Sequence, residues 1–188
     1  MYKVVGIVGS PRPISNTRYL VGEALETLKK EGIDVELITL GDKRIAPCEA
    51  CNACAELYTC RIEDDFQEIY EKMVSADGII IGSPVYFGSA TPQVMALLDR
   101  AGYIGIKTRA FERKAGAAIA VARRAGANFT FAQLNYFFFI NGMIVPGSTY
   151  WNVGYGLNPE SVKDDEEAIR TVQNLAKNMA WLIKKLKA

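Results

Sequence analysis

Val4-Val5-Gly6-Ile7-Val8-Gly9-Ser10-Pro11-Arg12-Pro13-Ile14-Ser15-Asn16-Thr17 is the stretch that decides the fold. Val4 to Val8 is apolar at almost every position, which predicts a buried strand. Apolar residues at helical spacing follow the loop and predict a helix that ends at Glu31-Gly32. Ser15, Asn16 or Thr17 can cap the start of this helix. A strand, a polar loop and a helix N-terminus together predict an anion site, because the first N–H groups of a helix have no partner and its dipole favours negative charge.

The hydroxyl groups of this loop and the guanidinium of Arg12 can complete a shell around a phosphate group. The loop has neither G-x-G-x-x-G nor G-x-x-x-x-G-K-[ST], so it carries no dinucleotide or nucleoside-triphosphate fingerprint. An ordinary capped helix start is the alternative interpretation.

Strand and helix patterns alternate along the rest of the chain. Further strands are predicted at 35–40, 79–82, 115–122 and 143–145, and further helices at 65–76, 94–100, 129–140 and 164–186. The helix at 94–100 is expected to stop at Gly102, and residues 147–163 are expected to form a loop. This alternation predicts one α/β domain over residues 1–188, with a doubly wound, five-stranded parallel sheet in the order 2-1-3-4-5.

Two further loops are predicted at the edge of the sheet where the first strand ends, and ligands bind at this edge in such folds. Residues 83–91, after the third strand, combine aromatic side chains with accessible N–H groups. Tyr86 and Phe87 alone are more often core residues, but beside a phosphate site we interpret them as a platform for a ring. Residues 123–128, after the fourth strand, include glycine and alanine, which let a flat ligand approach the backbone.

All four cysteines lie in one loop, which is predicted as an insertion at about residues 41–62. They are Cys48, Cys51, Cys54 and Cys60, with the spacing C-x2-C-x2-C-x5-C. Thiolates this close together favour an iron–sulfur cubane, which takes one cysteine on each iron. Zinc sites usually separate two C-x2-C pairs by a longer span, and disulfides fit poorly between cysteines three residues apart. Zinc and free thiols remain the alternatives.

Composition limits the classes of partner. The net charge of the 188-residue chain is +1, and the only basic run is Lys184 to Lys187, so nucleic-acid binding is not expected. Met1-Tyr2-Lys3 runs straight into the first strand, and no apolar run is long enough to span a bilayer, so we expect a cytoplasmic protein without a signal peptide. The absence of histidine removes the commonest general base. The helix at 129–140 is apolar nearly all round, which favours an oligomer interface.

Several motifs resemble a known family. Gly-Ser-Pro-Arg at 9–12, Ser-Asn-Thr at 15–17, Ser-Pro-Val-Tyr-Phe-Gly at 83–88 and Leu-Asp-Arg at 98–100 are similar to the NAD(P)H-dependent FMN reductase superfamily of flavodoxin-like folds. The cysteine run narrows this resemblance to the iron–sulfur flavoproteins of archaea and anaerobes. The resemblance implies one FMN and one [4Fe–4S] cluster per subunit, a homodimer or homotetramer, and one-electron exchange with a ferredoxin-type carrier.

The resemblance also assigns residues. It implies that the FMN phosphate is held by Ser10, Arg12, Ser15, Asn16 and Thr17. It implies that the isoalloxazine ring is lined by Pro84, Val85, Tyr86, Phe87 and Gly88. The loop after the fourth strand departs from the family pattern, which is often glycine-rich there, and we expect Arg123 and Gly126 beside the ring. The four cysteines are the implied cluster ligands.

These features predict an FMN-dependent electron-transfer flavoprotein, in which the cofactors carry the redox chemistry and no catalytic acid–base pair is required. A second hypothesis is an NAD(P)H-dependent reductase of free flavin, quinones or ferric chelates. A third is a zinc-stabilised, flavodoxin-like binding module.

Overall fold

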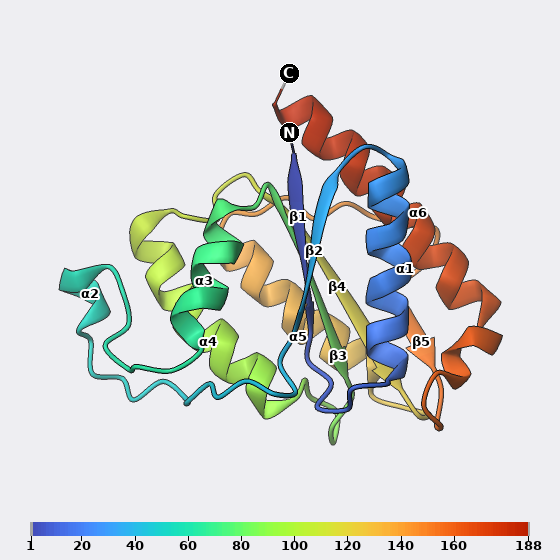
Figure 1. Cartoon of the computed structure of the whole chain (residues 1–188), viewed down its shortest axis with the longest axis horizontal. Coiled ribbons are helices and arrows are strands. Elements are labelled where there is room, and N and C mark those ends of the chain that lie inside the picture. The colour runs from blue at the N-terminus through green and yellow to red at the C-terminus, as the bar shows by residue number, and fades with distance from the viewer. Residues whose placement is uncertain (1, 188) are drawn as a thin grey trace.

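The computed structural model describes residues 2–187, and its centre is a parallel sheet of five strands (Figure 1). The strand order is β2-β1-β3-β4-β5, which confirms the predicted order 2-1-3-4-5. The strands are β1 (Lys3–Val8), β2 (Asp34–Thr39), β3 (Gly78–Pro84), β4 (Ala115–Ala122) and β5 (Val153–Tyr155). β3 and β4 are buried at almost every position because helices cover both faces of the sheet.

Helices cover the two faces in two groups (Figure 1). α1 (Asn16–Lys30) and α6 (Glu166–Leu186) pack together on one face. α3 (Phe66–Ser75), α4 (Pro92–Thr108) and α5 (Ala127–Ile140) cover the other face. A short helix, α2 (Cys54–Leu57), lies in the long loop between β2 and α3, and a 3-10 helix (Ser161–Asp164) precedes α6.

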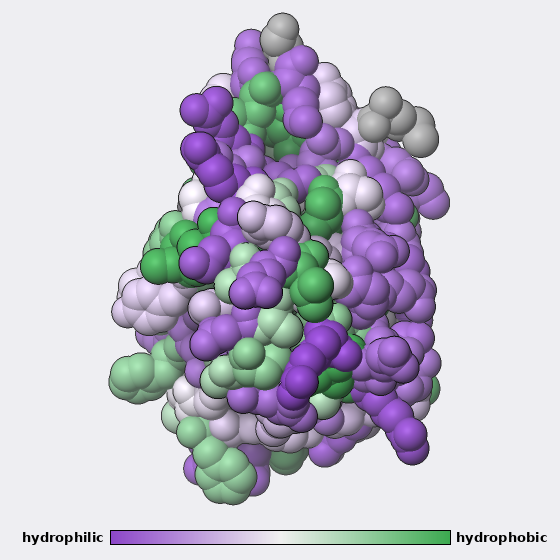
Figure 2. Space-filling model, turned by 90° about the vertical axis from the view of Figure 1, so that its left-hand side faces the viewer, coloured by the Kyte–Doolittle hydropathy of each residue, from purple (hydrophilic) through white to green (hydrophobic). Residues whose placement is uncertain are grey.

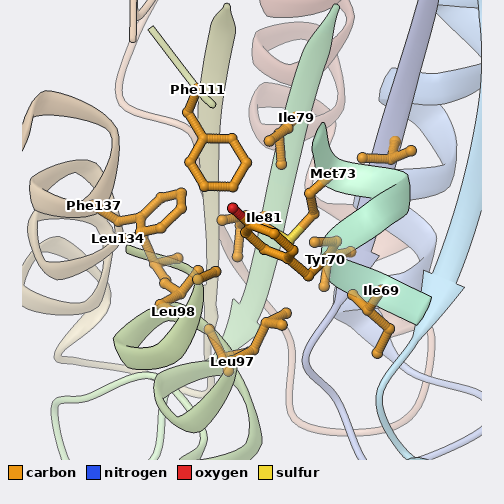
Figure 3. Close-up of a cluster of buried hydrophobic side chains, with 14 of the residues drawn as sticks. Ile69, Tyr70, Met73, Ile79, Ile81, Leu97, Leu98, Phe111, Leu134 and Phe137 are labelled. Atoms are coloured by element: carbon orange, nitrogen blue, oxygen red, sulfur yellow. The ribbon is translucent and has the colours of Figure 1, made fainter. Parts of the chain in front are cut away.

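The core under α3, α4 and α5 is rich in aromatic rings (Figure 3). Phe66, Tyr70, Phe111 and Phe137 follow one another with ring centroids 5.5 to 5.8 Å apart. Cys54 and Cys60 are half-buried and pack against this cluster. The cysteine loop is therefore attached to the core on this face of the sheet.

The prediction of a fifth strand at residues 143–145 is wrong. Ile144 forms one isolated bridge to Ala115, and the fifth strand is instead Val153–Tyr155, which pairs with Ala120–Ala122. The local sequence favours a strand at residues 143–145 because all three residues are apolar. Pairing is decided by where the chain returns to β4, and it returns at residues 153–155 within the segment expected to be a loop.

The prediction that the helix after β3 stops at Gly102 is also wrong, since α4 continues to Thr108. Gly102 and Gly105 face α5 and the segment that follows α4. A Cβ atom on Gly105 would stand 2.5 Å from the ring of Phe111 and 2.5 Å from Oδ1 of Asn141. Gly105 thus allows close packing, and the helix passes through both glycines rather than ending at Gly102.

The carboxyl ends of β1 and β3 are joined directly. The N–H of Gly9 donates to the carbonyl of Gly82 at 2.7 Å, and the hydroxyl of Thr91 donates to the carbonyl of Gly9 at 2.9 Å. These bonds bring the loops after β1 and β3 to the same edge of the sheet. Among residues 2–187, no helix is both long enough and apolar enough to cross a membrane.

Candidate functional site

The loop after β1 and the start of α1 form the first part of the strand-end site, which we define as residues 10–17, 84–88 and 123–126. Ser15 is the N-cap of α1, as predicted, and its Oγ accepts from the N–H of Arg18 at 3.2 Å. In the described chain, the N–H groups of Asn16 and Thr17 have no acceptor. Ser10 and Thr17 are buried, and Arg12 is exposed at the rim. The free N–H groups and the helix dipole favour an anion here.

The side chain of Asn16 has a structural role in addition to its predicted role in the phosphate site. Its amide nitrogen donates to the carbonyl of Asn158 at 3.0 Å, and its amide oxygen accepts from the N–H of Val162 at 3.2 Å. The side chain thus ties the start of α1 to the segment before α6. With these bonds in place, the backbone N–H of Asn16 and one of its two side-chain N–H groups remain without a partner within residues 2–187.

The loop after β3 ends in a tight turn. The N–H of Tyr86 donates to the carbonyl of Ser89 at 2.8 Å, and the N–H of Ser89 donates back at 3.1 Å. Phe87 and Gly88 between them have φ values of 52° and 80°, the signature of a type I′ turn. The ring of Phe87 is fully exposed and that of Tyr86 is 42% exposed, so neither is a core residue. This observation favours the platform interpretation of the pair.

Few backbone donors of this turn are free. Pro84 has no N–H, and the N–H of Val85 donates to the carbonyl of Val121 at 2.8 Å. Within residues 2–187, the N–H groups of Phe87 and Gly88 have no acceptor. These two groups are the ones that could meet the polar edge of a flat ring.

The loop after β4 touches this turn through Gly126. Gly126 has a φ of 84°, and a Cβ atom there would stand 3.0 Å from Cγ1 of Val85 and 3.2 Å from Cα of Gly88. A side chain here would be strained at this φ and would crowd Val85 and Gly88, so glycine is favoured. Arg123 and Arg124 are exposed, and neither forms an ion pair within the described residues. Two free cations therefore stand at the end of β4.

Sequence reasoning missed one buried contact at this site. Oγ of Ser83 accepts from the N–H of Thr91 at 3.0 Å, and both residues are fully buried. Thr91 also bonds to Gly9, so the hydroxyl pair holds the loops after β1 and β3 in register. The signal in the sequence is a hydroxyl residue at each end of the 83–91 loop.

The four cysteines line one cavity of about 130 Å³, which we call the cysteine cavity. Arg61, Arg100 and Tyr103 complete its wall. Cys48 and Cys51 are exposed, whereas Cys54 and Cys60 are half-buried. The volume is far above the roughly 15 Å³ that a single water needs. The structure therefore brings together the four thiols that the spacing predicted as one ligand set.

The thiols surround the cavity without meeting at one point. Among residues 2–187, no three cysteine or acidic side chains come close enough to hold a single metal ion. A tetrahedral zinc site needs four ligands on one ion, whereas each thiolate of a cubane binds a different iron. The chain thus offers four thiols around one cavity, and its described residues show no assembled metal site.

The backbone of the cysteine loop is tightly wound. Ala50, Asn52 and Tyr58 all have positive φ values between 52° and 57°, although none is glycine. The N–H of Ala50 points at the sulfur of Cys48, 3.4 Å away, and the hydroxyl of Tyr103 donates to the side chain of Asn52 at 3.1 Å. Such conformations persist only where surrounding contacts hold them.

Burial and neighbouring charges oppose ionisation of the Cys54 thiol. Burial raises the pKa of Cys54, and the charges of the neighbouring Cys60, Cys48 and Cys51 raise this pKa further. A bound cationic centre would offset both effects, because metal binding and thiol deprotonation are linked.

Arg100 and Asp64 lie beside the cavity and were not among the predicted site residues. Nη1 of Arg100 donates to Oδ2 of Asp64 at 2.7 Å, and Nη2 donates to Oδ1 at 3.0 Å. The guanidinium also lies 4.1 Å above the ring of Phe66. Burial acts to lower the pKa of Arg100, but the bonds to Asp64 and the charge of Cys60 outweigh it, so this pKa is raised. Burial acts to raise the pKa of Asp64, yet the bonds from Arg100, Ala46 and Phe66 leave it lowered, so both groups are charged.

Helix α4 connects the two sites. Its first residue, Pro92, follows the loop after β3, and Arg100 lies eight residues further, about 12 Å along the axis at 1.5 Å per residue. Figure 1 shows the long β2–α3 loop running from the carboxyl edge of the sheet to α2 on the outer side of α4. The strand-end site and the cysteine cavity are thus separate sites on one chain.

Comparisons with known proteins identify related sequences over most of the chain. The family model described as NADPH-dependent FMN reductase matches residues 2–158. An iron-sulfur flavoprotein of Methanocaldococcus jannaschii is 44% identical, over 98% of this chain and 99% of the relative. An iron-sulfur flavoprotein of Methanosarcina thermophila is 38% identical, over 94% of this chain and 93% of the relative.

Solved structures show the same fold at low sequence identity. RosB with a bound 8-demethyl-8-formylriboflavin-5'-phosphate matches with a TM-score of 0.79 at 19% identity, over 100% of this chain and 81% of that one. A flavodoxin, WrbA-like protein of Agrobacterium tumefaciens matches with a TM-score of 0.69 at 13% identity, over 98% of both chains.

Proposed function

Because the chain belongs to the iron–sulfur flavoproteins of the NADPH-dependent FMN reductase family, and is thus an FMN-dependent oxidoreductase, we propose that it transfers electrons between FMN and a one-electron carrier of the ferredoxin type. FMN would bind at the strand-end site. A [4Fe–4S] cluster would bind in the cysteine cavity, held by Cys48, Cys51, Cys54 and Cys60.

The observation that carries this proposal is the position of the cysteines. All four line one cavity, and the same cavity is walled by α4, whose first residue, Pro92, follows the loop after β3. When bound, FMN exchanges electrons singly or in pairs and the cluster exchanges them one at a time. A chain that holds both can therefore serve carriers of different stoichiometry.

The residues of the chain bind and orient the flavin. The N–H groups of Asn16 and Thr17 and the hydroxyl of Ser10 would receive the phosphate, with Arg12 at its outer side. The free N–H groups of Phe87 and Gly88 would meet the ring edge. Gly126 leaves room for the ring loops to touch, and the cations of Arg123 and Arg124 favour a more negative, reduced flavin.

The surface around α2 suits a transient partner. Leu57 and Tyr58 are exposed there, and Figure 2, which looks onto this side of the molecule, shows hydrophobic residues in small patches between hydrophilic ones. Weak electron-transfer contacts are small and mixed in character. A ferredoxin-type carrier would dock close to the two exposed thiols, Cys48 and Cys51.

A second candidate function is NAD(P)H-dependent reduction of flavin, quinones or ferric chelates. The matched family model favours it, and so does the open platform of Tyr86 and Phe87, which leaves space for a second planar reactant. Under this proposal the cysteines would be structural or redox-active and would not serve a ferredoxin-type carrier.

Self-association is a further part of the proposal. α5 buries one side against the sheet and exposes Phe129, Tyr136, Phe139 and Ile140 on the other. Apolar side chains in this number on one helix are typical of an interface between subunits. We expect a homodimer or homotetramer in solution, to be measured by light scattering after size exclusion.

The test is chemical analysis of protein purified without oxygen, followed by rapid kinetics. We expect about four iron and four sulfide per chain, with bound FMN and broad visible absorption. Reduced ferredoxin should reduce the flavin faster than NADH or NADPH does. One zinc with no iron would overturn the cluster, and faster reduction by a nicotinamide would favour the reductase.

A further inference from the structure

The cysteine loop is closed at its base by one side chain from a distant helix. All four cysteines lie between Ala46 and Ile62 in the sequence. Nη1 of Arg100 donates to the carbonyl of Ala46 at 3.1 Å, and Nη2 donates to the carbonyl of Ile62 at 3.2 Å. A single guanidinium on α4 therefore holds both ends of the loop.

Asp64 completes this closure. Its two oxygens accept from both terminal nitrogens of Arg100, and Oδ2 also accepts from the N–H of Ala46 at 2.7 Å. Both backbone polar groups of Ala46 are thus held by one ion pair. The side chains of Arg100 and Asp64 are only 1% and 9% exposed, so water does not compete for these bonds. Lysine cannot replace this planar fork, because its ammonium is a single point charge.

One donor of the guanidinium is left over. Arginine has five N–H groups, and four of them are used by Asp64, Ala46 and Ile62. Nε is buried and has no partner within residues 2–187. Arg100 lines the cysteine cavity together with Cys60, and Cys60 is near enough for its charge to act on the guanidinium. A buried donor is normally paired, and the sulfur of Cys60 is close enough to the guanidinium to act as an acceptor.

We propose that Arg100 is a positioning residue for the cluster: it closes the cysteine loop at its base and donates Nε–H to the sulfur of Cys60 when that sulfur ligates iron. The inference rests on the proposed function, because it assumes a cluster in the cysteine cavity. Hydrogen bonds to ligand sulfurs stabilise the more negative, reduced form of a cluster and so raise its reduction potential. Arg100 thus acts on both the retention of the cluster and its potential.

The competing explanation is that Arg100 and Asp64 are an ordinary buried ion pair with no effect on the metal. The two explanations predict different effects of substituting Arg100 on the reduction potential of the cluster, because a purely structural pair would not change that potential. They also differ in the exchange of loop amides in the metal-free chain. Both measurements are independent of turnover.

The experiment compares Arg100→Lys with the matched control Arg109→Lys. Arg109 follows the last residue of the same helix and bonds to Glu112 through two of its nitrogens, but it is exposed and lies outside the cysteine cavity. We expect Arg100→Lys to lower the cluster potential in a titration followed by electron paramagnetic resonance. We also expect iron to pass to a chelator about tenfold faster, as is common when a partner of a metal ligand is lost. Arg109→Lys should leave both quantities close to wild type.

Hydrogen exchange of metal-free protein tests the closure separately. Amides at 46–62 should exchange faster in Arg100→Lys than in wild type, with FMN content unchanged as the control for folding. A second variant, Asp64→Asn, should loosen the loop but change the potential less, because it keeps Nε–H.

Three results would overturn the proposal. They are an unchanged potential in Arg100→Lys, an equal shift in Arg109→Lys, and an Asp64→Asn shift as large as that of Arg100→Lys. Wild-type protein that takes up no iron would overturn the proposed function and the Cys60 contact with it. Amide exchange would then still decide whether Arg100 closes the loop.

Discussion

Residues from three loops far apart in the sequence form the strand-end site, whereas the thiols of the cysteine cavity come from thirteen consecutive residues. The first site is mostly backbone, and its shape follows from the ends of buried strands that pair over many residues. The second is mostly side chain, and it is fixed to the core by Arg100, Asp64 and the packing of Cys54 and Cys60. The strand-end site should therefore persist without its ligand, while the cysteine cavity should depend on a few polar contacts and on metal.

The largest expected effect comes from removing the partner of the buried arginine. Asp64→Ala leaves Arg100 charged and unpaired in the core, and breaking a buried pair in this way costs about 3–5 kcal/mol of unfolding free energy. Urea denaturation measures this change. Glu49→Ala, which removes the exposed partner of Arg61, should change stability little. Equal losses of unfolding free energy in Asp64→Ala and Glu49→Ala would show that the cavity does not depend on the buried pair.

Removing one thiol should weaken the cysteine cavity without affecting the strand-end site. Cys60→Ser is expected to reduce iron affinity at least about 10- to 100-fold, a loss typical even of partners outside the metal's own ligands. FMN content should stay at the wild-type level, because no cysteine lies in the strand-end site. Iron and flavin analyses of the same sample measure both. Loss of FMN together with iron would contradict the independence of the sites.

A change at Gly126 should have the opposite effect: it should weaken the strand-end site and leave the cysteine cavity unchanged. Gly126→Ala places a Cβ atom against Gly88 at a positive φ, which costs roughly 1–2 kcal/mol and pushes the two ring loops apart. FMN affinity should fall by about tenfold, as 1.4 kcal/mol implies, with iron content unchanged. Titration of metal-loaded protein with FMN measures the affinity. Gly147→Ala is the control, since nothing lies within 4 Å of a Cβ there.

Acid should weaken the cysteine cavity before the strand-end site. The native pKa of Asp64 is lowered, so the stability from this carboxylate is fully present above its ordinary value of about 3.9 and is lost as pH falls through the native pKa. The difference in unfolding free energy between wild type and Asp64→Asn should be constant from about pH 7 to 5 and shrink below about pH 3.9. A difference that grows in acid would contradict the sign of this linkage.

Much of the fold could be predicted because local patterns and long-range packing agree. The β1 stretch, the Ser15 cap and the alternation of strands and helices all identify the doubly wound sheet in its observed order. The predicted ring residues also fall on one turn, and Gly126 reaches it. Asn16 shows the limit of motif reading, since its side chain bonds to the segment before α6 in a way that only the folded chain determines.

The sequence by itself determined which residues could serve chemistry: four thiols in one compact run, a polar loop before a helix, and no histidine. These features are local, and they depend on residue type and spacing alone. The tertiary structure decided that residues 153–155 rather than 143–145 form the fifth strand, that α4 passes through Gly102, and that Arg100 reaches the base of the cysteine loop. Each of these depends on which distant segments pack together, and the pattern of neighbouring residues along the chain does not specify that packing.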